Sequence, residues 1–259
     1  MARRVSKRKR SSREDYMLKE QLKIEEGVFD NRTMMMLSKL FTHKIISALR
    51  FIIAKGKEGN VYLANAGEEV KAEYVAVKIF RIETSSFHNR VDYMIGDPRF
   101  PKIKKSLFWI VNEWCKKEFG NLKIAHAAKI HAPVPYYFGG NVLAMEFLGD
   151  SDNLAPKLKD VVVENPKLVL KTIIKDIKKL YEYELVHADM SEYNILMKDG
   201  VPYMIDFGQA VIAKHPNAMM FLRRDVYNIT KYFQRKYRFE TDPDVAYDYV
   251  TGKNKTYSL

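Results

Sequence analysis

Cysteine and long apolar runs are scarce in this sequence. Cys115 is the only cysteine among 259 residues, so no disulfide can form within the chain, as is typical of proteins from a reducing compartment. No apolar run approaches the ~20 residues that a membrane-spanning helix needs. The basic amino-terminal residues also lack the apolar stretch of a secretory signal. We therefore expect a soluble, cytoplasmic protein without a membrane partner.

The two signs of charge are unequal. Lys and Arg number 44 against 32 Asp and Glu, and seven of these cations lie within the first thirteen residues. Such a run repels itself and buries nothing, so it predicts a flexible basic tail over residues 1–15. Clustered cations also gain affinity for polyanions through counterion release, which makes RNA contact through the tail a reasonable hypothesis. The seven cations are Arg3, Arg4, Lys7, Arg8, Lys9, Arg10 and Arg13.

The amino-terminal third combines a helical pattern with a strand pattern. Apolar positions from Met34 to Ala48 recur at helical spacing, and Asp30 or Thr33 could cap this helix. We predict a helical element over 16–50, either a packed accessory pair of helices or a small nucleic-acid-binding unit. Segments 51–54, 60–64 and 74–80 are β-prone.

The rest of the chain predicts two lobes. A long helix over 107–128 and a hairpin over 134–147 complete a β-rich amino lobe over 51–148, with a flexible loop over about 82–105. Helices dominate the carboxyl lobe over 149–259, where short strands return at 184–187, 195–197 and 202–205. The predicted fold class is α+β and bilobal, with an extra amino-terminal helical element.

Two aspartates and an asparagine form the most specific pattern. Asp189 and Asn194 lie five residues apart between two short strands, and Asp206 begins an Asp-Phe-Gly sequence at the end of another strand. A phosphoryl-transfer site needs one carboxylate to orient the attacking hydroxyl, an amide oxygen for a metal ion and a second carboxylate that bridges metal and phosphates. Each motif is weak alone, but the order and spacing after Val-Ala-Val-Lys at 75–78 are specific. We predict Asp189, Lys78 and Asp206 as catalytic, and Asn194 and Asp206 as metal ligands.

Glu118 is the predicted partner of Lys78. It falls within an apolar stripe of the long helix, and a buried carboxylate without a cation is costly. A Lys78–Glu118 ion pair would satisfy both residues and place the lysine near nucleotide phosphates; Glu113, off the stripe, is the second choice. The stripe consists of Val111, Trp114, Cys115, Leu122 and Ala125.

Two further segments predict nucleotide contacts. The first lies twenty-two residues before Lys78, where a phosphate-covering loop belongs, and has two of the three glycines of that pattern. The second ends the hairpin, where the Glu146 carbonyl and the Leu148 amide could bind adenine and Met145 could limit the depth of the pocket. An ordinary turn and an ordinary strand end are the alternatives. The first segment is Gly56, Lys57, Glu58, Gly59, Asn60 and Val61.

Together these motifs resemble the RIO family of atypical serine protein kinases, and its first subfamily in particular. The resemblance implies a kinase-like fold, ATP with Mg²⁺ or Mn²⁺, serine autophosphorylation or ATP hydrolysis, and a role in maturing the small ribosomal subunit, whose precursor protein and rRNA would be its partners. It also implies that Asp206 could accept phosphate as an aspartyl-phosphate. The motifs that carry it lie at 56–62, 117–122, 145–149, 187–194, 205–210 and 215–218.

The sequence departs from ordinary protein kinases in ways that bear on its substrates. Ala188 replaces the arginine before the catalytic aspartate, and no Ala-Pro-Glu follows Gly208. We therefore expect a carboxyl lobe without peptide-docking helices, slow turnover on peptides and a self-directed use of ATP. Ser85, Ser86 and Ser106 are candidate autophosphorylation sites, although Ser106 could instead cap the long helix.

Two other classes of function remain open from the sequence. Small-molecule phosphotransferases share the His-x-Asp-x-x-x-x-Asn loop, and a ribosome-assembly scaffold could use nucleotide only as a conformational clamp. The complete Asp-Phe-Gly and the basic tail argue against the small-molecule phosphotransferase, and the filled catalytic positions argue against a protein without catalysis. His43, His88, His126 and His131 lack metal-ligand spacing and are interpreted as surface or structural residues.

Overall fold

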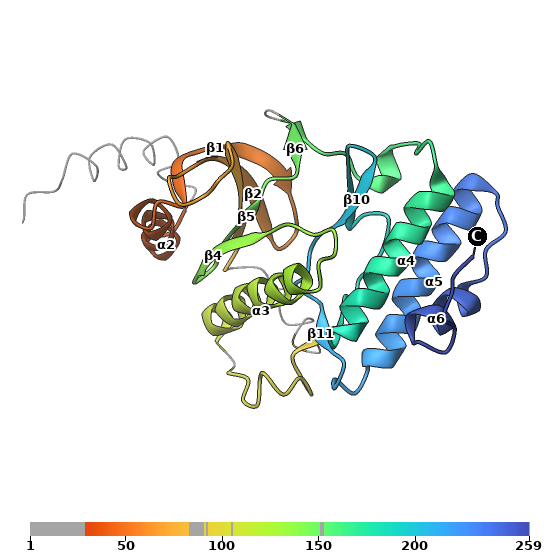
Figure 1. Ribbon diagram of the computed structural model, residues 1–259. Coiled ribbons are helices and arrows are strands. Elements are labelled where there is room, and N and C mark those ends of the chain that lie inside the picture. Colours follow the sequence, from red (N-terminus) through yellow and green to blue (C-terminus); the bar gives the residue numbers. More distant parts are fainter. Residues whose placement is uncertain (1–28, 83–90, 92, 105, 151–152, 259) are drawn as a thin grey trace, which may run out of the picture.

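The computed structural model describes residues 29–82, 91, 93–104, 106–150 and 153–258 (Figure 1). The predicted basic tail, Ser85 and Ser86 lie outside these residues. The elements are α2 (Asn31–Thr42), β1 (Ile46–Lys55), β2 (Gly59–Ala66), β3 (Tyr74–Phe80), α3 (Leu107–Ala127), β4 (Pro135–Gly139), β5 (Val142–Glu146), β6 (Gly149–Asp150), β7 (Asn153–Leu154), the 3₁₀-helix η2 (Leu158–Asp160), α4 (Pro166–Glu182), β8 (Leu185–Val186), β9 (Ile195–Lys198), β10 (Val201–Met204), β11 (Val211–Ile212), α5 (Ala218–Tyr237) and α6 (Pro243–Val250).

A five-stranded antiparallel sheet forms the amino-terminal part, with strand order β1-β2-β3-β5-β4. Successive side chains of a strand point to opposite faces, so the central strand β3 divides its residues between two environments. Val75 and Val77 pack in the hydrophobic cluster that also holds Leu37 of α2. Ala76 belongs to a different cluster, on the face that Lys78 shares. The strand period therefore directs Lys78 away from α2.

The carboxyl-terminal part is helical, and α3 joins it to the sheet (Figure 1). One large hydrophobic cluster takes in α4, α5 and α6 together with α3 and the sheet residue Leu143. Asn165 caps α4 by accepting a hydrogen bond from the Leu168 amide at 3.0 Å, as its position before proline predicts. Two short antiparallel pairs, β9 with β10 and β8 with β11, flank the loop that holds Asp189. Among the described residues, no helix is long and apolar enough to cross a membrane.

The helix predicted from Met34 to Ala48 is wrong at its carboxyl end. α2 ends at Thr42, Lys44 adopts a left-handed backbone with φ of 53°, and β1 begins at Ile46. Pairing of β1 with β2 buries Ile46, so sheet formation outweighs the local helical spacing. At the other end Asp30 is the cap, because its carboxylate accepts a hydrogen bond from the Thr33 amide at 2.7 Å.

The loop expected over 82–105 is described at residues 82, 91 and 93–104, and some of these residues pack into the interior. After a 3₁₀ position at Tyr93 they form turns and bends, yet Met94 is fully buried and Asp97 is 2% exposed. Asp97 forms an ion pair with Arg99, whose Nη1 donates to Asn121 of α3 at 2.7 Å. A charged, proline-containing stretch can thus be well packed when its charges neutralise one another.

Candidate active site

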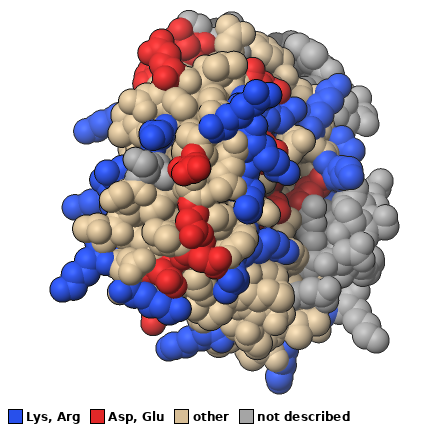
Figure 2. Space-filling view, turned by 90° about the vertical axis from the view of Figure 1, so that its right-hand side faces the viewer, with Lys and Arg blue, Asp and Glu red and all other residues tan. Residues whose placement is uncertain are grey.

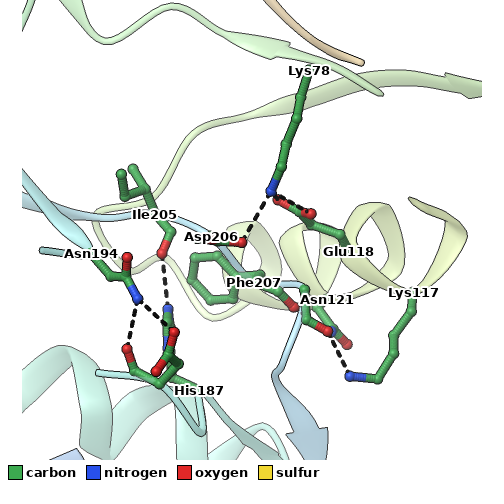
Figure 3. A network of polar contacts seen from close by, with 11 residues as sticks. Lys78, Lys117, Glu118, Asn121, His187, Asn194, Ile205, Asp206 and Phe207 are labelled. Carbon is green, nitrogen blue, oxygen red and sulfur yellow. Dashed lines mark hydrogen bonds and ion pairs between the residues drawn. The ribbon is translucent and has the colours of Figure 1, made fainter. Parts of the chain in front are cut away.

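The ion pair predicted from the sequence is present between β3 and α3. Nζ of Lys78 lies 2.8 Å from both carboxylate oxygens of Glu118, which is 1% exposed (Figure 3). Burial raises the pKa of Glu118, and the lysine opposes that rise. Glu113, the second choice, instead lies 3.7 Å from Lys116 on the same helix. The buried carboxylate therefore fixes where the ammonium group of Lys78 lies.

Asp206 completes a three-membered ionic cluster. Its Oδ1 lies 3.0 Å from Nζ of Lys78, and its side chain is 40% exposed (Figure 3). Burial alone would lower the pKa of Lys78, but the carboxylates of Asp206 and Glu118 outweigh burial and raise it. Lys78 therefore stays cationic at neutral pH. One carboxylate of the cluster is closed to solvent, whereas Asp206 remains open to it.

Asp189 and Asn194 are held together in the neighbouring loop. Nδ2 of Asn194 donates to the backbone carbonyl of Asp189 at 2.8 Å and to its Oδ2 at 2.9 Å. The amide oxygen of Asn194 lies on the side away from these two bonds (Figure 3). The backbone amide of Ile205 donates to the Asn194 carbonyl at 3.0 Å, so this loop lies beside the strand end that carries Asp206.

Asp225 of α5 binds the backbone of the same loop. Its carboxylate accepts hydrogen bonds from the backbone amides of Ala188 at 2.7 Å and Met190 at 2.9 Å, the residues on either side of Asp189. Burial raises the pKa of Asp225 to about 7, and the two amides oppose this rise. Ala188 and Asp206 both have φ of 64°, a left-handed conformation that is costly for residues other than glycine. Strain of this kind persists because the surrounding contacts hold it.

His187 is a structural residue of the loop. It is 2% exposed, its ring packs edge-on against Phe207, and its Nε2 donates to the Ile205 carbonyl at 3.1 Å. Burial lowers the pKa of His187 to about 4, so the ring is neutral at physiological pH.

Within the described part of the chain, no group of three His, Cys, Asp or Glu residues could hold a metal ion.

α3 also holds the backbone that follows Asp206, through two residues to which sequence analysis gave no role. Nζ of Lys117 donates to the carbonyls of Gly208 at 2.8 Å and Ala210 at 2.6 Å. Nδ2 of Asn121 donates to the carbonyls of Phe207 at 2.8 Å and Ala210 at 3.0 Å (Figure 3). Four bonds from neighbouring turns of one helix therefore fix the Asp-Phe-Gly segment.

Lys117→Met is expected to lower phosphoryl transfer, the activity that the sequence predicts, by about tenfold or more, because the buried Gly208 carbonyl loses its side-chain donor and the Ala210 carbonyl keeps only the bond from Asn121. Burial, then repulsion by Arg99, lowers the pKa of Lys117 from 10.5 to about 7. Between these values the unfolded chain binds the proton that the folded chain has lost, so this lysine makes stability rise with pH over that window. The variant should lose this slope in denaturant titrations. Lys116→Met, at an exposed neighbour, is the matched control; an unchanged slope in Lys117→Met would contradict the assignment.

A cleft of about 250 Å³ lies between the sheet and the helical part, and it gathers the predicted nucleotide residues. Asn60 is the exception: it lines a different hollow and accepts a hydrogen bond from Arg81 at 3.1 Å. Leu154, Lys157 and Leu196 also line the cleft, and the sequence pattern did not single them out. The predicted residues that line it are Gly56, Lys57, Glu58, Gly59, Val61, Lys78, Glu118, Met145, Glu146, Leu148 and Asp206.

The two glycines of the covering loop have different reasons to be glycine. A Cβ on Gly59 would lie 2.1 Å from the carbonyl oxygen of Ile79, so close pairing of β2 with β3 excludes a side chain there. A Cβ on Gly56 would meet only the Gly59 carbonyl, at 3.1 Å. The Gly56 amide donates to that carbonyl at 2.9 Å and closes the turn. Strand packing alone therefore accounts for Gly59.

The RIO domain model matches residues 60–246, most of the chain. The chain belongs to the RIO family. RIO-type serine/threonine-protein kinase Rio1 of Haloferax volcanii is 39% identical over 253 residues, covering 96% of this chain and 86% of that protein. The protein of the same name from Methanocaldococcus jannaschii is 43% identical over 235 residues, covering 90% and 79%. This RIO protein is accordingly a phosphotransferase.

The solved structures support the fold. The crystal structure of the Rio2 kinase–ADP/Mg²⁺–phosphoaspartate complex from Chaetomium thermophilum has a TM-score of 0.62 and 22% identity, and the match covers 86% of this RIO chain and 71% of that chain. At this identity the likeness establishes architecture alone. The predicted α+β, bilobal kinase-like fold is confirmed.

Proposed function

We propose that this RIO protein transfers the γ-phosphoryl group of ATP to serine or threonine hydroxyls of proteins, itself included. The observation that carries the proposal is the cluster of Lys78, Glu118 and Asp206, which lines the cleft beside the loop that holds Asp189 and Asn194. A lysine held cationic by two carboxylates suits the phosphates of a nucleotide, since phosphoryl transfer depends mainly on positioning and charge neutralisation.

The oxygen atoms beside Asp189 are of the kind that bind a hard divalent cation, Mg²⁺ or Mn²⁺. Both amide hydrogen bonds of Asn194 go to Asp189, which leaves the amide oxygen as a ligand, and the half-exposed carboxylate of Asp206 supplies further oxygens. Oxygen ligands of this type suit Mg²⁺ together with substrate phosphates. When bound, such an ion neutralises charge on the phosphates.

The chain's own residues account for the proton and the geometry of the proposed reaction. The oxygen of the acceptor hydroxyl forms a bond to the γ-phosphorus while the bond to the β–γ bridging oxygen breaks and ADP leaves. The hydroxyl proton goes to the carboxylate of Asp189, which Asn194 orients through Nδ2. Asp225 holds the loop by the amides on both sides of Asp189, so the base is already in place before the substrate binds.

A second acceptor within the site would turn the kinase into an ATPase. The exposed carboxylate of Asp206 can attack the γ-phosphorus, release ADP and form an acyl phosphate, which water then hydrolyses to orthophosphate and the free carboxylate. The Asp206 side chain is 40% exposed, whereas that of Glu118 is 1% exposed, so of the two carboxylates bound to Lys78 it is Asp206 that a phosphate can reach. The phosphoaspartate in the Chaetomium Rio2 complex supports this proposal.

Chemical stability of the label distinguishes the two acceptors. After incubation with [γ-³²P]ATP and Mg²⁺, phosphoserine should survive neutral hydroxylamine, while an acyl phosphate on Asp206 should be released by it. We expect a hydroxylamine-labile fraction that Asp206→Asn removes, together with stable label on serine. Mass mapping should place the stable label; Ser106, exposed at the start of α3 without a side-chain capping bond, is one candidate. Label that is entirely stable would exclude the acyl phosphate.

The proposed setting is the precursor of the small ribosomal subunit, with contacts to its protein and rRNA. The family resemblance and the cations of residues 1–13 support this setting. Co-sedimentation with precursor particles at increasing salt, with the full chain and a chain lacking residues 1–13, tests it. We expect salt-sensitive binding that weakens without those residues. Binding that is equal in both chains would remove the tail from the proposal.

A further inference from the structure

A second hollow, of about 400 Å³, lies next to the Asp189 loop and outside the nucleotide cleft. Ser191 and Glu192 of the loop form one wall, and α5 forms the other. Lys and Arg side chains are spread over the side of the molecule that carries α5 and α6, with acidic side chains between them (Figure 2). The α5 residues that line the hollow are Tyr227, Asn228, Lys231 and Arg235. We call this hollow the basic groove.

The charges of the two cations in the basic groove are not neutralised by ion pairs with described residues. Neither Lys231 nor Arg235 takes part in an ion pair among the residues that the structure describes, and both are exposed. Arg223 of the same helix, by contrast, is paired with Asp244 of α6 at 2.8 Å. Glu192 is the one carboxylate among the lining residues, so the basic groove keeps a net positive charge.

α5 fixes the distance between the basic groove and the reacting atoms. It holds the loop through Asp225 and through Nδ2 of Asn228, which donates to the Met190 carbonyl at 3.4 Å. At a rise of 1.5 Å per residue, Lys231 and Arg235 follow Asn228 by about 5 and 10 Å along the axis. An extended peptide covers such distances in about two to four residues. The cations therefore lie within reach of residues that flank an acceptor serine at Asp189.

We propose that the basic groove binds an acidic segment of the phosphoacceptor protein, with Asp or Glu within about four residues of the acceptor serine. The proposal rests on the proposed function and names its substrate class. Lys231 and Arg235 are four residues apart on one helix face, about 6 Å along the axis, and alternate side chains of an extended peptide are about 6.6 Å apart. RNA would need a longer run of cations along its phosphates, whereas this groove offers two and a carboxylate.

Charge reversal with a matched control tests the proposal. The test variant is Lys231→Glu/Arg235→Glu, and the control is Lys175→Glu/Lys255→Glu, which changes the net charge equally at exposed residues away from the groove. Binding of two fluorescent serine peptides, one flanked by Glu and one by Lys, is followed by anisotropy in the full chain. We expect the wild type and the control to favour the Glu peptide, and the test variant to bind it about tenfold more weakly.

The outcomes separate this proposal from the function on which it rests. No preference for the Glu peptide in the wild type, or equal weakening in both variants, would overturn the basic groove as a peptide site. Loss of binding to a single-stranded RNA in the test variant, with peptide binding unchanged, would assign the groove to RNA instead. Peptide preference that is lost only in the test variant, in a protein that transfers no phosphate from ATP, would support the groove and contradict the proposed function.

Discussion

Asp189→Asn is expected to lower the rate of phosphoryl transfer by about 10²–10⁴-fold, the usual contribution of a general base, while affinity for ATP stays nearly unchanged. The amide cannot accept the hydroxyl proton, but it preserves the shape of the side chain. Asp189 is not among the residues that line the nucleotide cleft, so ATP binding should not depend on its charge. Single-turnover transfer from [γ-³²P]ATP and nucleotide titration measure the two quantities separately.

The control for this variant is Asp199→Asn. Asp199 is an exposed residue of the β9–β10 turn with φ of 51°, a conformation that asparagine adopts readily. We expect wild-type transfer from it. An Asp189→Asn enzyme that transfers phosphate at the wild-type rate, or one whose whole defect lies in ATP affinity, would contradict the role given to Asp189.

Lys78→Met is expected to abolish measurable transfer and to lower the free energy of unfolding at neutral pH by about 3–5 kcal/mol, the usual result of removing one partner of a buried ion pair. Glu118 is 1% exposed and would keep a buried charge without its cation. The double variant Lys78→Met/Glu118→Leu should regain most of the stability and none of the activity, because the charge that loses its cation is then only that of Asp206, whose side chain is 40% exposed to solvent. Denaturant unfolding and the transfer assay, run on the same preparations, check both halves.

The stability defect of Lys78→Met should depend on pH. Burial already raises the pKa of Glu118, and loss of the lysine removes the interaction that opposes this rise. The folded variant then binds a proton at Glu118 that the unfolded chain releases, so its stability relative to wild type falls as pH rises above the usual carboxyl range. The deficit should therefore be smaller at about pH 5 than at about pH 7.5. A deficit that is equal at both values would contradict an unpaired Glu118.

Much of the site could be predicted because its charges interrupt apolar patterns. Glu118 lies in the apolar stripe of Trp114 and Leu122, where a buried carboxylate needs a cation, and the predicted partner, Lys78, is the one that the structure shows. Lys117 and Asn121 lie on the Trp114 side of the helix as well. Their partners are backbone carbonyls, however, and every residue has one, so the sequence does not indicate which carbonyls they bind.

The remaining differences come from tertiary contacts. The helical spacing includes Ile46, but pairing with β2 places this residue in a strand. Asp97 and Arg99 lie in a charged, polar stretch of the sequence, and only the folded chain brings Asn121 to Arg99. The argument used for Glu118 could also have predicted that Asp225 is buried and needs partners, because it lies among the buried apolar residues of α5. Its donors are the amides of the Asp189 loop, which only the folded chain brings there.

The central claim, that the cleft transfers the γ-phosphoryl group of ATP, is tested most directly by following both protein-bound label and free phosphate from [γ-³²P]ATP with Mg²⁺. Wild type, Asp189→Ala and Asp206→Ala should be compared at equal nucleotide occupancy. We predict that wild type gives labelled protein, free phosphate or both, and that each variant loses them. Wild-type protein that binds ATP but forms neither product would contradict the claim and favour a scaffold clamped by nucleotide.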